Sequence, residues 1–466
     1  MIAKSIVFVL TTCIVVAGFA FGKDNMFSRL KVEQSWDIAE VPSGFPVPFS
    51  LLTEGDRQYV AYFDKDRQMT VASRKMNSDQ WQYQTLPSKV GWDSHNYITM
   101  AVDNDGHLHV SGNMHGVPLI YFRTQKARDI TTLKGLSMTG TLENRVTYPH
   151  FLKDHNGDLI FTYRHGGSGN GINVYNKYNA QERVWIRLLQ SPLFDGEGKR
   201  NAYPLGPIRG PDGWFHVVWV WRDSPDCATN HHLSHARSKD LLNWETFFGD
   251  KVALPLTLGE EKLWVDPIPS GGGIINGCQK LFFDANNRPI LTYHKADADG
   301  NMQIYAARPE NREWRFYRLT EWDKPIKFSG GGTMGFIGIS ISGLSRVEPG
   351  VLTMTYQHCD YGSGRVFIDE QTLQPLMKTI AVVPDYPEQI NRVQSEFEGM
   401  RIRRAEDMGD SSDQAARFIL QWETLEPNRD HPRKPPLPSP STLRLYKLVA
   451  NTDSEAANKA IDSDKK

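Results

Sequence analysis

Short runs in which apolar and polar residues alternate, joined by turns rich in Gly and Asp, recur along the chain. The clearest run spans residues 91–116, GWDSHNYITMAVDNDGHLHVSGNMHG. It predicts two antiparallel strands around a turn at Asp103–Gly106, because Asp-Gly between alternating apolar residues is a strong hairpin signal. The residue before the first strand, His95, and the residue ending the second, His115, then lie at the same end of the hairpin. We therefore expect two imidazoles on one surface.

The same pattern recurs at six further places. Strong copies turn at Asn156-Gly157, Asp212-Gly213, Asn286-Asn287 and Pro349-Gly350, and weaker copies surround Gly55 and Asp407–Glu423. The copies are spaced roughly 50 to 75 residues apart, enough for about four short strands each. Repeated four-stranded units that bury their faces against their neighbours are typical of a β-propeller. We therefore predict an all-β fold, a single-domain seven-bladed β-propeller over residues 23–450.

Polar and reactive residues stand at equivalent points of these units. In a propeller, the start of each inner strand and the end of the next strand lie on one axial face. The residues expected at these points in the third to sixth units are Tyr148 and Arg164, Tyr203 and Arg222, Cys278 and His294, and His358 with Cys359. This face is therefore the predicted functional surface.

The amino-acid composition agrees with this fold and limits the kinds of ligand that the protein can attract by its overall charge. Aromatic residues make up 11% of the chain, and its 38 Gly and 27 Pro suit many short strands joined by tight turns. The 53 Lys and Arg nearly balance the 54 Asp and Glu, so no global charge supports a nucleic-acid partner. An anionic ligand must be recognised locally.

The two ends of the chain differ from the rest. Residues 1–22 have the pattern of a secretory signal, with Lys4 before the apolar run SIVFVLTTCIVVAGFAF. An uncleaved membrane anchor is the alternative, but the run is near the short end for a span. We expect a secreted or periplasmic monomer with no membrane partner, in which residues 24–48 lead into the first unit. Residues 441–449 should form a last strand, and residues 451–466 a disordered tail.

Four residues from two neighbouring units could carry out chemistry together: His95, His115, Tyr148 and Arg164. An Arg can neutralise a carboxylate and acidify the neighbouring C–H, while a His or Tyr takes that proton and the other protonates the leaving oxygen. This chemistry is β-elimination on a uronic-acid polysaccharide. Each residue alone is more often a hydrogen-bonded scaffold residue, and only the combination favours a site.

The sequence also resembles propeller proteins with BNR-type repeats, and more narrowly the seven-bladed ulvan lyases of polysaccharide lyase families 24 and 25. The resemblance covers nearly the whole chain after the signal. It is carried by DSHNYITMAVD, HVSGNMHGVPLIYFR, TYPHF, YRHGGSGNG, and VWRD followed by TNHHLSHARS.

The resemblance implies a role for each candidate. It implies His95 and Tyr148 as the proton-transferring pair, with base and acid left open, and Arg164 as the group that neutralises the carboxylate. His115 then assists at the uronate. Tyr203 is interpreted as a sugar-packing residue and Arg222 as a sulfate or carboxylate contact, with simple packing and a structural ion pair as the alternative. The implied partner is an anionic polysaccharide, ulvan, in which sulfated rhamnose alternates with glucuronate or iduronate.

A second group of residues suggests a metal. Cys227 and His231 follow one hairpin, Cys278 opens the next, and Asp223 is close in sequence. Two Cys, a His and an Asp would satisfy tetrahedral Zn²⁺, and the resemblance implies a structural metal in some members without assigning its ligands. Competing ligands are His232, His294, His358 and Cys359. Buried thiols with capped turns are the alternative, and no HExxH motif indicates a catalytic metal.

Two other function classes share this fold. A sialidase needs three arginines for the substrate carboxylate and a Tyr–Glu nucleophile pair. In the equivalent places this chain has mainly His, Tyr and Cys, with Arg164 and Arg222. A propeller that binds carbohydrate without cleaving it is the other alternative.

Overall fold

The computed structural model describes residues 30–378 and 380–451. Strands dominate this part of the chain, and its helical segments are short 3-10 turns: η1 (Ile130–Thr132), η2 (Cys227–Thr229), η3 (Glu261–Leu263) and η4 (Glu388–Ile390). Over the same residues, no helix has the length and apolar character needed to cross a membrane. The predicted signal, residues 1–22, and the predicted tail from residue 452 lie outside the described residues.

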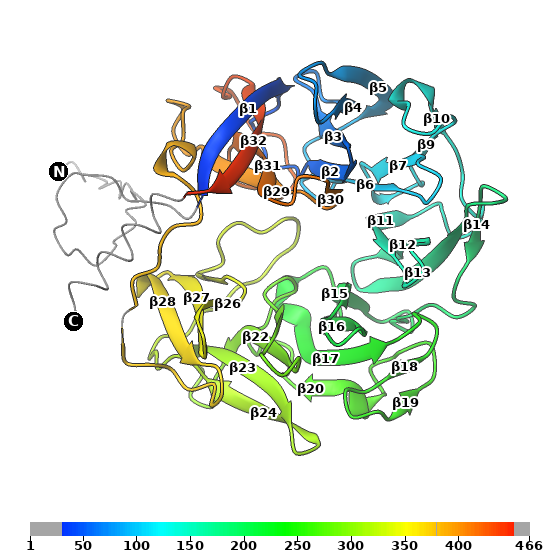
Figure 1. Cartoon of the computed structure of the whole chain (residues 1–466). Helices are drawn as coiled ribbons and strands as arrows, with labels where there is room; N and C mark the ends of the chain where they lie inside the picture. The colour runs from blue at the N-terminus through cyan, green and yellow to red at the C-terminus, as the bar shows by residue number, and fades with distance from the viewer. Residues whose placement is uncertain (1–29, 379, 452–466) are drawn as a thin grey trace, which may run out of the picture.

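The described strands form seven sheets that follow one another in chain order around a common centre (Figure 1). The first three sheets met along the chain after β1 contain β2 (Ser50–Gly55), β3 (Arg57–Phe63), β4 (Gln68–Lys75), β5 (Gln82–Lys89) and β30 (Asp410–Ser411); β6 (Ile98–Val102), β7 (Leu108–Gly112), β9 (Tyr121–Thr124) and β10 (Leu133–Gly135); and β8 (His115–Val117), β11 (Val146–Lys153), β12 (Leu159–Gly167), β13 (Asn170–Asn179) and β14 (Val184–Arg187).

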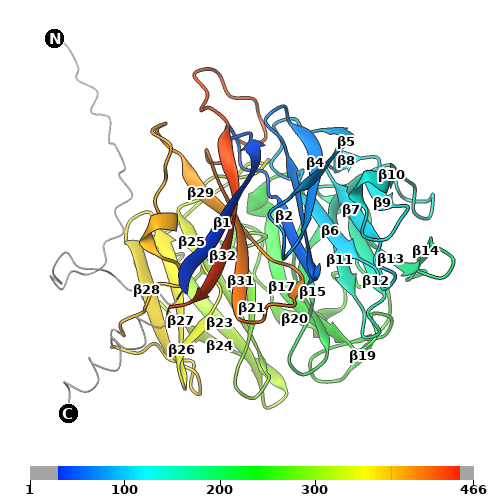
Figure 2. The same cartoon turned by 45° about the horizontal axis from the view of Figure 1, so that its top comes forward.

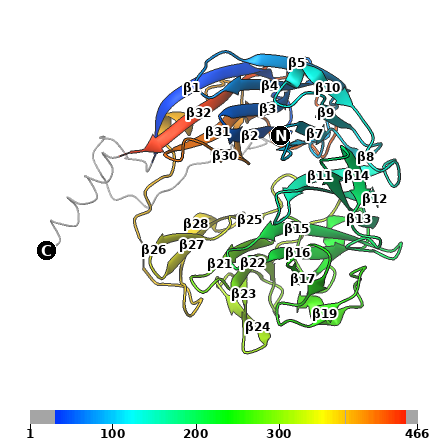
Figure 3. The same cartoon turned by 45° about the vertical axis from the view of Figure 1, so that its right-hand side comes forward.

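The next three sheets contain β15 (Asn201–Arg209), β16 (Phe215–Arg222), β17 (Asn230–Ser238), β18 (Trp244–Glu245), β19 (Lys251–Val252) and β20 (Trp264–Asp266); β21 (Lys280–Phe283), β22 (Pro289–Ala296), β23 (Met302–Glu310) and β24 (Glu313–Arg318); and β25 (Ile339–Ile341), β26 (Ser345–Glu348), β27 (Val351–His358) and β28 (Gly362–Asp369). In several sheets the strands lie successively further from the centre, as β22, β23 and β24 do (Figures 1 and 3).

The seventh sheet joins the two ends of the described chain. It contains β1 (Leu30–Val41), β32 (Ser441–Ala450), β31 (Ala416–Thr424) and β29 (Arg401–Glu406). β1 runs antiparallel to β32, from Leu30 opposite Ala450 to Val41 opposite Ser441 (Figure 2). The predicted last strand at 441–449 is therefore confirmed. The expectation that residues 24–48 merely lead into the first unit is wrong for 30–41, which are a strand of the last sheet.

The hairpins predicted from turn chemistry are present. β6 pairs with β7 around the turn at Asp103–Gly106, where the Asp103 carboxylate accepts hydrogen bonds from the backbone N–H groups of Asp105 and His107. Asp side chains favour turns because they bond to the backbone two residues on. Gly106 has a φ of 84°, a conformation that glycine adopts without a steric penalty.

The core lies between neighbouring sheets. Every residue of β16, FHVVWVWR, is buried, because this strand has a sheet on each of its faces. Trp219 and Trp221 pack there against Phe194, whose ring centre is 4.7 Å from that of Trp219. Burial of large aromatic side chains on both faces holds each sheet to the next. The site described below is built on this rigid support, from β11, β12, β15 and the loops beside them.

Candidate functional site

A short turn before β6 presents the first site residue. The backbone N–H of His95 donates to Asp93 Oδ1 at 2.8 Å, and the same oxygen lies 2.8 Å from His95 Nδ1. An Asp two residues before the His thus holds both its backbone and its ring, as Asp does in turns. The His95 side chain is 19% exposed, so the ring is held without being removed from solvent.

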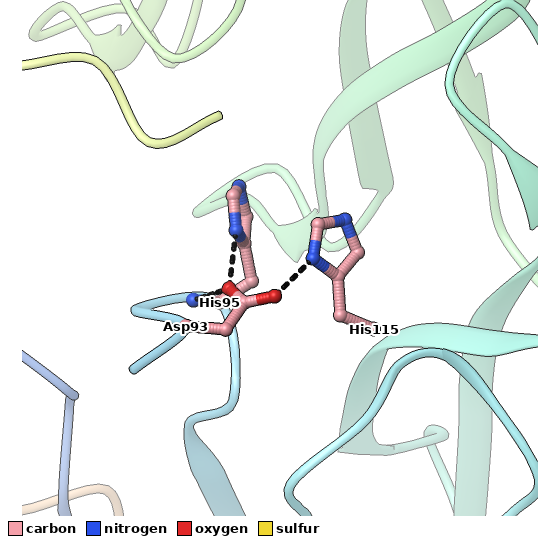
Figure 4. Close-up of side chains that lie close together, drawn as sticks. All are labelled: Asp93, His95 and His115. Atoms are coloured by element: carbon pink, nitrogen blue, oxygen red, sulfur yellow. Dashed lines mark hydrogen bonds and ion pairs between the residues drawn. The ribbon is translucent and has the colours of Figure 1, made fainter. Parts of the chain in front are cut away.

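The Asp93 carboxylate bridges two imidazoles (Figure 4). Its other oxygen, Oδ2, lies 2.5 Å from His115 Nδ1, and the ring centres of His95 and His115 are 4.3 Å apart. The two rings therefore meet, as the hairpin pattern predicted. Asp93 was not among the predicted residues, although its place two residues before His95 in DSHN was a signal for such a turn.

His115 reaches this position by a different route from the predicted one. It does not end β7, which stops at Gly112, but begins β8, and Thr147 of β11 is its partner in the ladder. The chain therefore crosses from one sheet to the next between β7 and β8. The crossing brings the His115 ring close to residues of β11.

Tyr148 lies inside β11 rather than before it. The register of β11 against β12 shifts between Thr147 and His150, and Tyr148 has a φ of 58°. Pro149 has no N–H to donate to the ladder, which favours such an irregularity. The bulge turns the Tyr148 ring towards the histidines, with its centre 6.0 Å from that of His95.

Arg164 lies in β12, directly opposite Thr147, and not after the strand as predicted. Its guanidinium carbon is 4.8 Å from the centre of the Tyr148 ring. The side chain is 2% exposed, and Nη2 donates to Thr147 Oγ1 at 3.0 Å. Nε and Nη1 have no hydrogen-bond partner in the protein. Since an unpaired buried donor costs about 1–3 kcal/mol, this cation is poised for an anionic ligand.

A cavity of about 480 Å³ brings three candidates together, since His95, Tyr148 and Arg164 all line it. A second cavity of about 370 Å³ shares His95, Tyr148 and Lys280 with the first and extends towards Arg222. The two spaces therefore meet at the proposed proton-transferring pair. Volumes of this size suit individual sugar units of a longer chain.

Tyr203 lines the first cavity and Arg222 lines the second, and both side chains bond to other parts of the protein. The Tyr203 ring centre is 6.2 Å from that of Tyr148, and its hydroxyl lies 2.5 Å from Ser168 Oγ. Arg222 donates from Nε to the Ser224 carbonyl at 3.0 Å and from Nη1 to Asn276 Oδ1 at 3.2 Å. Arg222 is therefore largely bonded to the protein, unlike Arg164.

The surroundings shift the acidities of these groups. Burial raises the pKa of Tyr148 to about 12 although the nearby Arg164 opposes this, so the phenol stays protonated at neutral pH. Burial disfavours a charged His95, but its contacts with Asp430 and Asp93 outweigh burial and raise its pKa to about 9. Burial also opposes ionisation of Asp93, yet the hydrogen bonds from His115 and His95 hold its pKa well below the usual range.

The predicted zinc ligands do not come together. His231 Nε2 lies 3.0 Å from Asp223 Oδ1, but no three donor atoms of Asp223, Cys227, His231 and Cys278 lie within 4.8 Å of one another. Cys278 instead pairs with the buried His294, which lowers the pKa of the thiol against the effect of burial. These four residues do not fit one tetrahedral ion. Asp223, Cys227 and His231 follow one another from the end of β16 into β17 of one sheet, and Cys278 precedes β21 of the next. Closeness in sequence therefore did not bring their donor atoms together.

Two other groups have donor atoms within 4.8 Å of one another in the described residues: Asp93 with His95 and His115, and His358 with Cys359 and Asp360. Either spacing could hold a cation. In the first group, however, both carboxylate oxygens already bond to the imidazoles. We interpret that group as a proton-handling cluster.

The fold and the site thus define an all-β protein of repeated sheets with an imidazole–phenol–guanidinium pocket. Residues 57–322 match the BNR repeat-containing family, which is more than half of the 466 residues. The chain belongs to that family.

Two curated relatives match shorter segments. The short isoform of ulvan lyase from Alteromonas sp. (strain LOR) is 36% identical over 142 residues, 28% of this chain and 27% of that protein. The long isoform from Pseudoalteromonas sp. (strain PLSV) is 40% identical over 78 residues, 16% of this chain and 8% of that protein. This chain therefore spans about a quarter or less of the length of these two relatives.

Solved structures match over most of the chain. The polysaccharide lyase Uly1 has a TM-score of 0.57 at 13% identity and covers 90% of this chain and 99% of its own. A PL25 ulvan lyase bound to -[GlcA(1-4)Rha3S]- has a TM-score of 0.54 at 15% identity, with 89% and 95% covered. The three proteins share a fold.

Proposed function

We propose that this protein is a polysaccharide lyase that cleaves an ulvan-type, uronate-containing polysaccharide by β-elimination. One observation carries the proposal: Arg164 is buried beside Tyr148 and His95 with two N–H donors unpaired. A uronate carboxylate placed in the cavity that Arg164 lines would accept a charge-assisted hydrogen bond from this guanidinium. The ulvan lyases among the relatives and the matching folds support this assignment.

The proposed reaction uses the three groups in sequence. Arg164 binds the uronate carboxylate and so acidifies the C–H beside it. Neutral His95 removes that proton, and Tyr148, which burial keeps protonated, donates its proton to the oxygen of the breaking glycosidic bond. One C–H bond and one C–O bond break, a C=C bond forms, and both protons are accounted for.

The neighbouring side chains bind the sugars in this proposal. His115, joined to His95 through Asp93, contacts the uronate. Tyr203 offers its ring face for sugar packing, and Arg222 helps to bind a sulfate or carboxylate from the second cavity. The net charge of −1 supplies no overall attraction for a polyanion, so these local cations must supply it.

Several broader predictions stay proposals. We interpret the seven sheets as the blades of a propeller, with the seventh sheet formed by both ends of the described chain. Export to the periplasm or the medium and a monomeric state remain predictions from the sequence. A structural zinc ion also remains one, with ligands other than the four predicted together. Elemental analysis of the dialysed protein tests it, and a metal-free sample would end that idea.

Incubation with ulvan tests the function directly. Elimination creates an unsaturated uronate, so ultraviolet absorbance should grow with time. Release of reducing ends without this absorbance would point to a hydrolase, and binding without turnover to a carbohydrate-binding protein. Parallel reactions with heparin, pectin and alginate, none of which should match the turnover of ulvan, define the substrate.

A further inference from the structure

Asp430, in the segment between β31 and β32, lies against the candidate base. Its Oδ2 is 3.3 Å from His95 Nδ1, and its Oδ1 accepts a hydrogen bond from the Ser94 backbone N–H at 3.1 Å. Ser94 and Asp430 are 336 residues apart in the sequence. The Asp430 side chain is only 14% exposed, so it is packed into the site and does not project into solvent.

The same carboxylate also holds a second loop. Asp430 Oδ2 accepts a hydrogen bond from the Thr333 N–H at 2.8 Å, and Thr333 Oγ1 lies 3.2 Å from His95 Nδ1. Thr333 belongs to the long loop between β24 and β25, which extends towards the middle of the sheets (Figure 1). One side chain therefore joins three segments of the chain at the His95 ring.

The backbone at Asp430 has an unusual conformation where it makes this contact. Arg429 and Asp430 have φ values of 49° and 65°, a region that residues other than glycine rarely adopt. Such conformations persist where the surroundings enforce them, often at functional sites. The β24–β25 loop packs tightly against this backbone, because a Cβ on Gly332 would lie 2.8 Å from the Arg429 carbonyl oxygen.

Asp430 complements Asp93 in holding the ring. Asp93 already divides its oxygens between the His95 ring and backbone on one side and His115 on the other. Asp430 adds a second carboxylate near the same ring nitrogen, Nδ1, and connects the ring to Thr333, which lines the second cavity together with His95 and Tyr148. Without Asp430, both the ring and this wall of the cavity would lose a common support.

We propose that Asp430 is a positioning residue for the reaction, which holds His95 Nδ1 towards the carboxylates and leaves Nε2 to exchange a proton with the substrate. This inference rests on the proposed role of His95. A carboxylate that orients an imidazole and stabilises its protonated form is a recurrent device for proton transfer.

The test compares Asp430→Asn with a matched control, Asp226→Asn. Asp226 also holds the β24–β25 loop, since its Oδ1 accepts the Gly330 N–H at 2.8 Å, but it has no contact with His95. In steady-state kinetics on ulvan across pH, Asp430→Asn should lower the pH-independent kcat, reached where His95 is neutral, by up to about 100-fold, with KM changed by less than about threefold. Its pH limb for His95 should move to lower pH, since a carboxylate partner is weakened. Asp226→Asn should keep the wild-type values.

A measurement independent of turnover separates this inference from the proposed function. The His95 ring signals, assigned by comparison with His95→Gln, are titrated by NMR in wild type, Asp430→Asn and Asp226→Asn. The titration of His95 should move to lower pH in Asp430→Asn and stay unchanged in Asp226→Asn. If the wild type shows no lyase activity, the proposed function fails while this titration still reports on the contact.

Three results would overturn the positioning role. They are a wild-type kcat and pH profile in Asp430→Asn, an unchanged His95 titration in that variant, or equal losses in both variants. If Asp430→Asn does not fold, as judged by circular dichroism, Thr333→Val replaces it. That variant removes a hydroxyl that contacts the ring at 3.2 Å and should lower kcat in the same way to a smaller extent. An unchanged kcat in Thr333→Val would then count against the role.

Discussion

The guanidinium carbon of Arg164 lies 4.8 Å from the centre of the Tyr148 ring. The two residues come from paired strands, β11 and β12, in which Arg164 stands opposite Thr147. The pairing places a cation and a phenol at the same end of one sheet. Because Arg164 also lines the cavity, its charge can act on a carboxylate bound there. The elimination proposal depends on this arrangement.

Arg164→Ala should lower kcat/KM about 100-fold or more, since it removes a preorganised charge that stabilises the transition state. The matched control is Arg237→Ala, whose guanidinium pairs with Glu245 Oε1 at 2.8 Å on the outer strands β17 and β18. The control should retain wild-type kinetics. Circular dichroism verifies folding, and near-normal turnover of folded Arg164→Ala would remove this residue from the chemistry.

Tyr148→Phe keeps the ring and removes the proton donor. We expect kcat to fall about 100- to 10,000-fold, the range for losing a general acid, with little change in thermal stability. Tyr83→Phe serves as control because the Tyr83 hydroxyl bonds to the Ile38 carbonyl at 3.3 Å on the outer strand β5. Equal activity of the two variants would show that the Tyr148 hydroxyl takes no part.

The rate should rise with pH between neutrality and about 9. The contacts with Asp93 and Asp430 raise the pKa of His95 to about 9, so below that pH the ring keeps its proton and cannot act as base. The other ionisable groups facing the ring are His115 and Tyr148, and Tyr148 stays protonated over this range. Measurement of kcat/KM at constant ionic strength tests this. A rate that stays level from neutrality and falls above about pH 9 would instead assign the acid role to His95.

Gly171→Ala should impair the site without touching the substrate. A Cβ at Gly171 would lie 2.5 Å from Asn201 Oδ1 and 3.1 Å from Arg164 Cδ, so the Asn201 side chain must shift and Arg164 must give way by a few tenths of an ångström. Misplacement of a catalytic group by about 1 Å can cost up to about 100-fold in rate, and overpacking about 1–3 kcal/mol in the free energy of unfolding. Gly343→Ala, with nothing within 4 Å of its added Cβ, should change neither. Kinetics and denaturant unfolding of both variants are compared, and unaltered turnover in Gly171→Ala would contradict this account.

Much of the site was predictable because its parts follow local rules. The turn at Asp103–Gly106 specifies a hairpin within a few residues, and a hairpin returns its two ends to one place. His95 and His115 met as predicted, although His115 lies beyond the hairpin, in β8 of the next sheet. The pairing of β11 with β12 in the next sheet brought Tyr148 and Arg164 together in the same way.

The positions that were predicted wrongly depend on contacts between sheets. His115 begins a strand of the neighbouring sheet, and residues 30–41 pair with residues at the other end of the chain. Strand ladders specify partners through register and packing, which a single segment does not carry. The predicted zinc ligands failed to meet even where three of them, Asp223, Cys227 and His231, share the β16–β17 region of one sheet. Closeness in sequence does not determine where side chains point.

The sequence by itself determined the strand-rich repeats, their turns, and the residue types available for chemistry, because turn geometry and side-chain alternation act over a few residues. Only the tertiary structure decided that Asp93 bridges two imidazoles and that Asp430 and Thr333 reach His95 from remote loops. Such contacts depend on how whole sheets pack, and packing is a property of the assembled molecule.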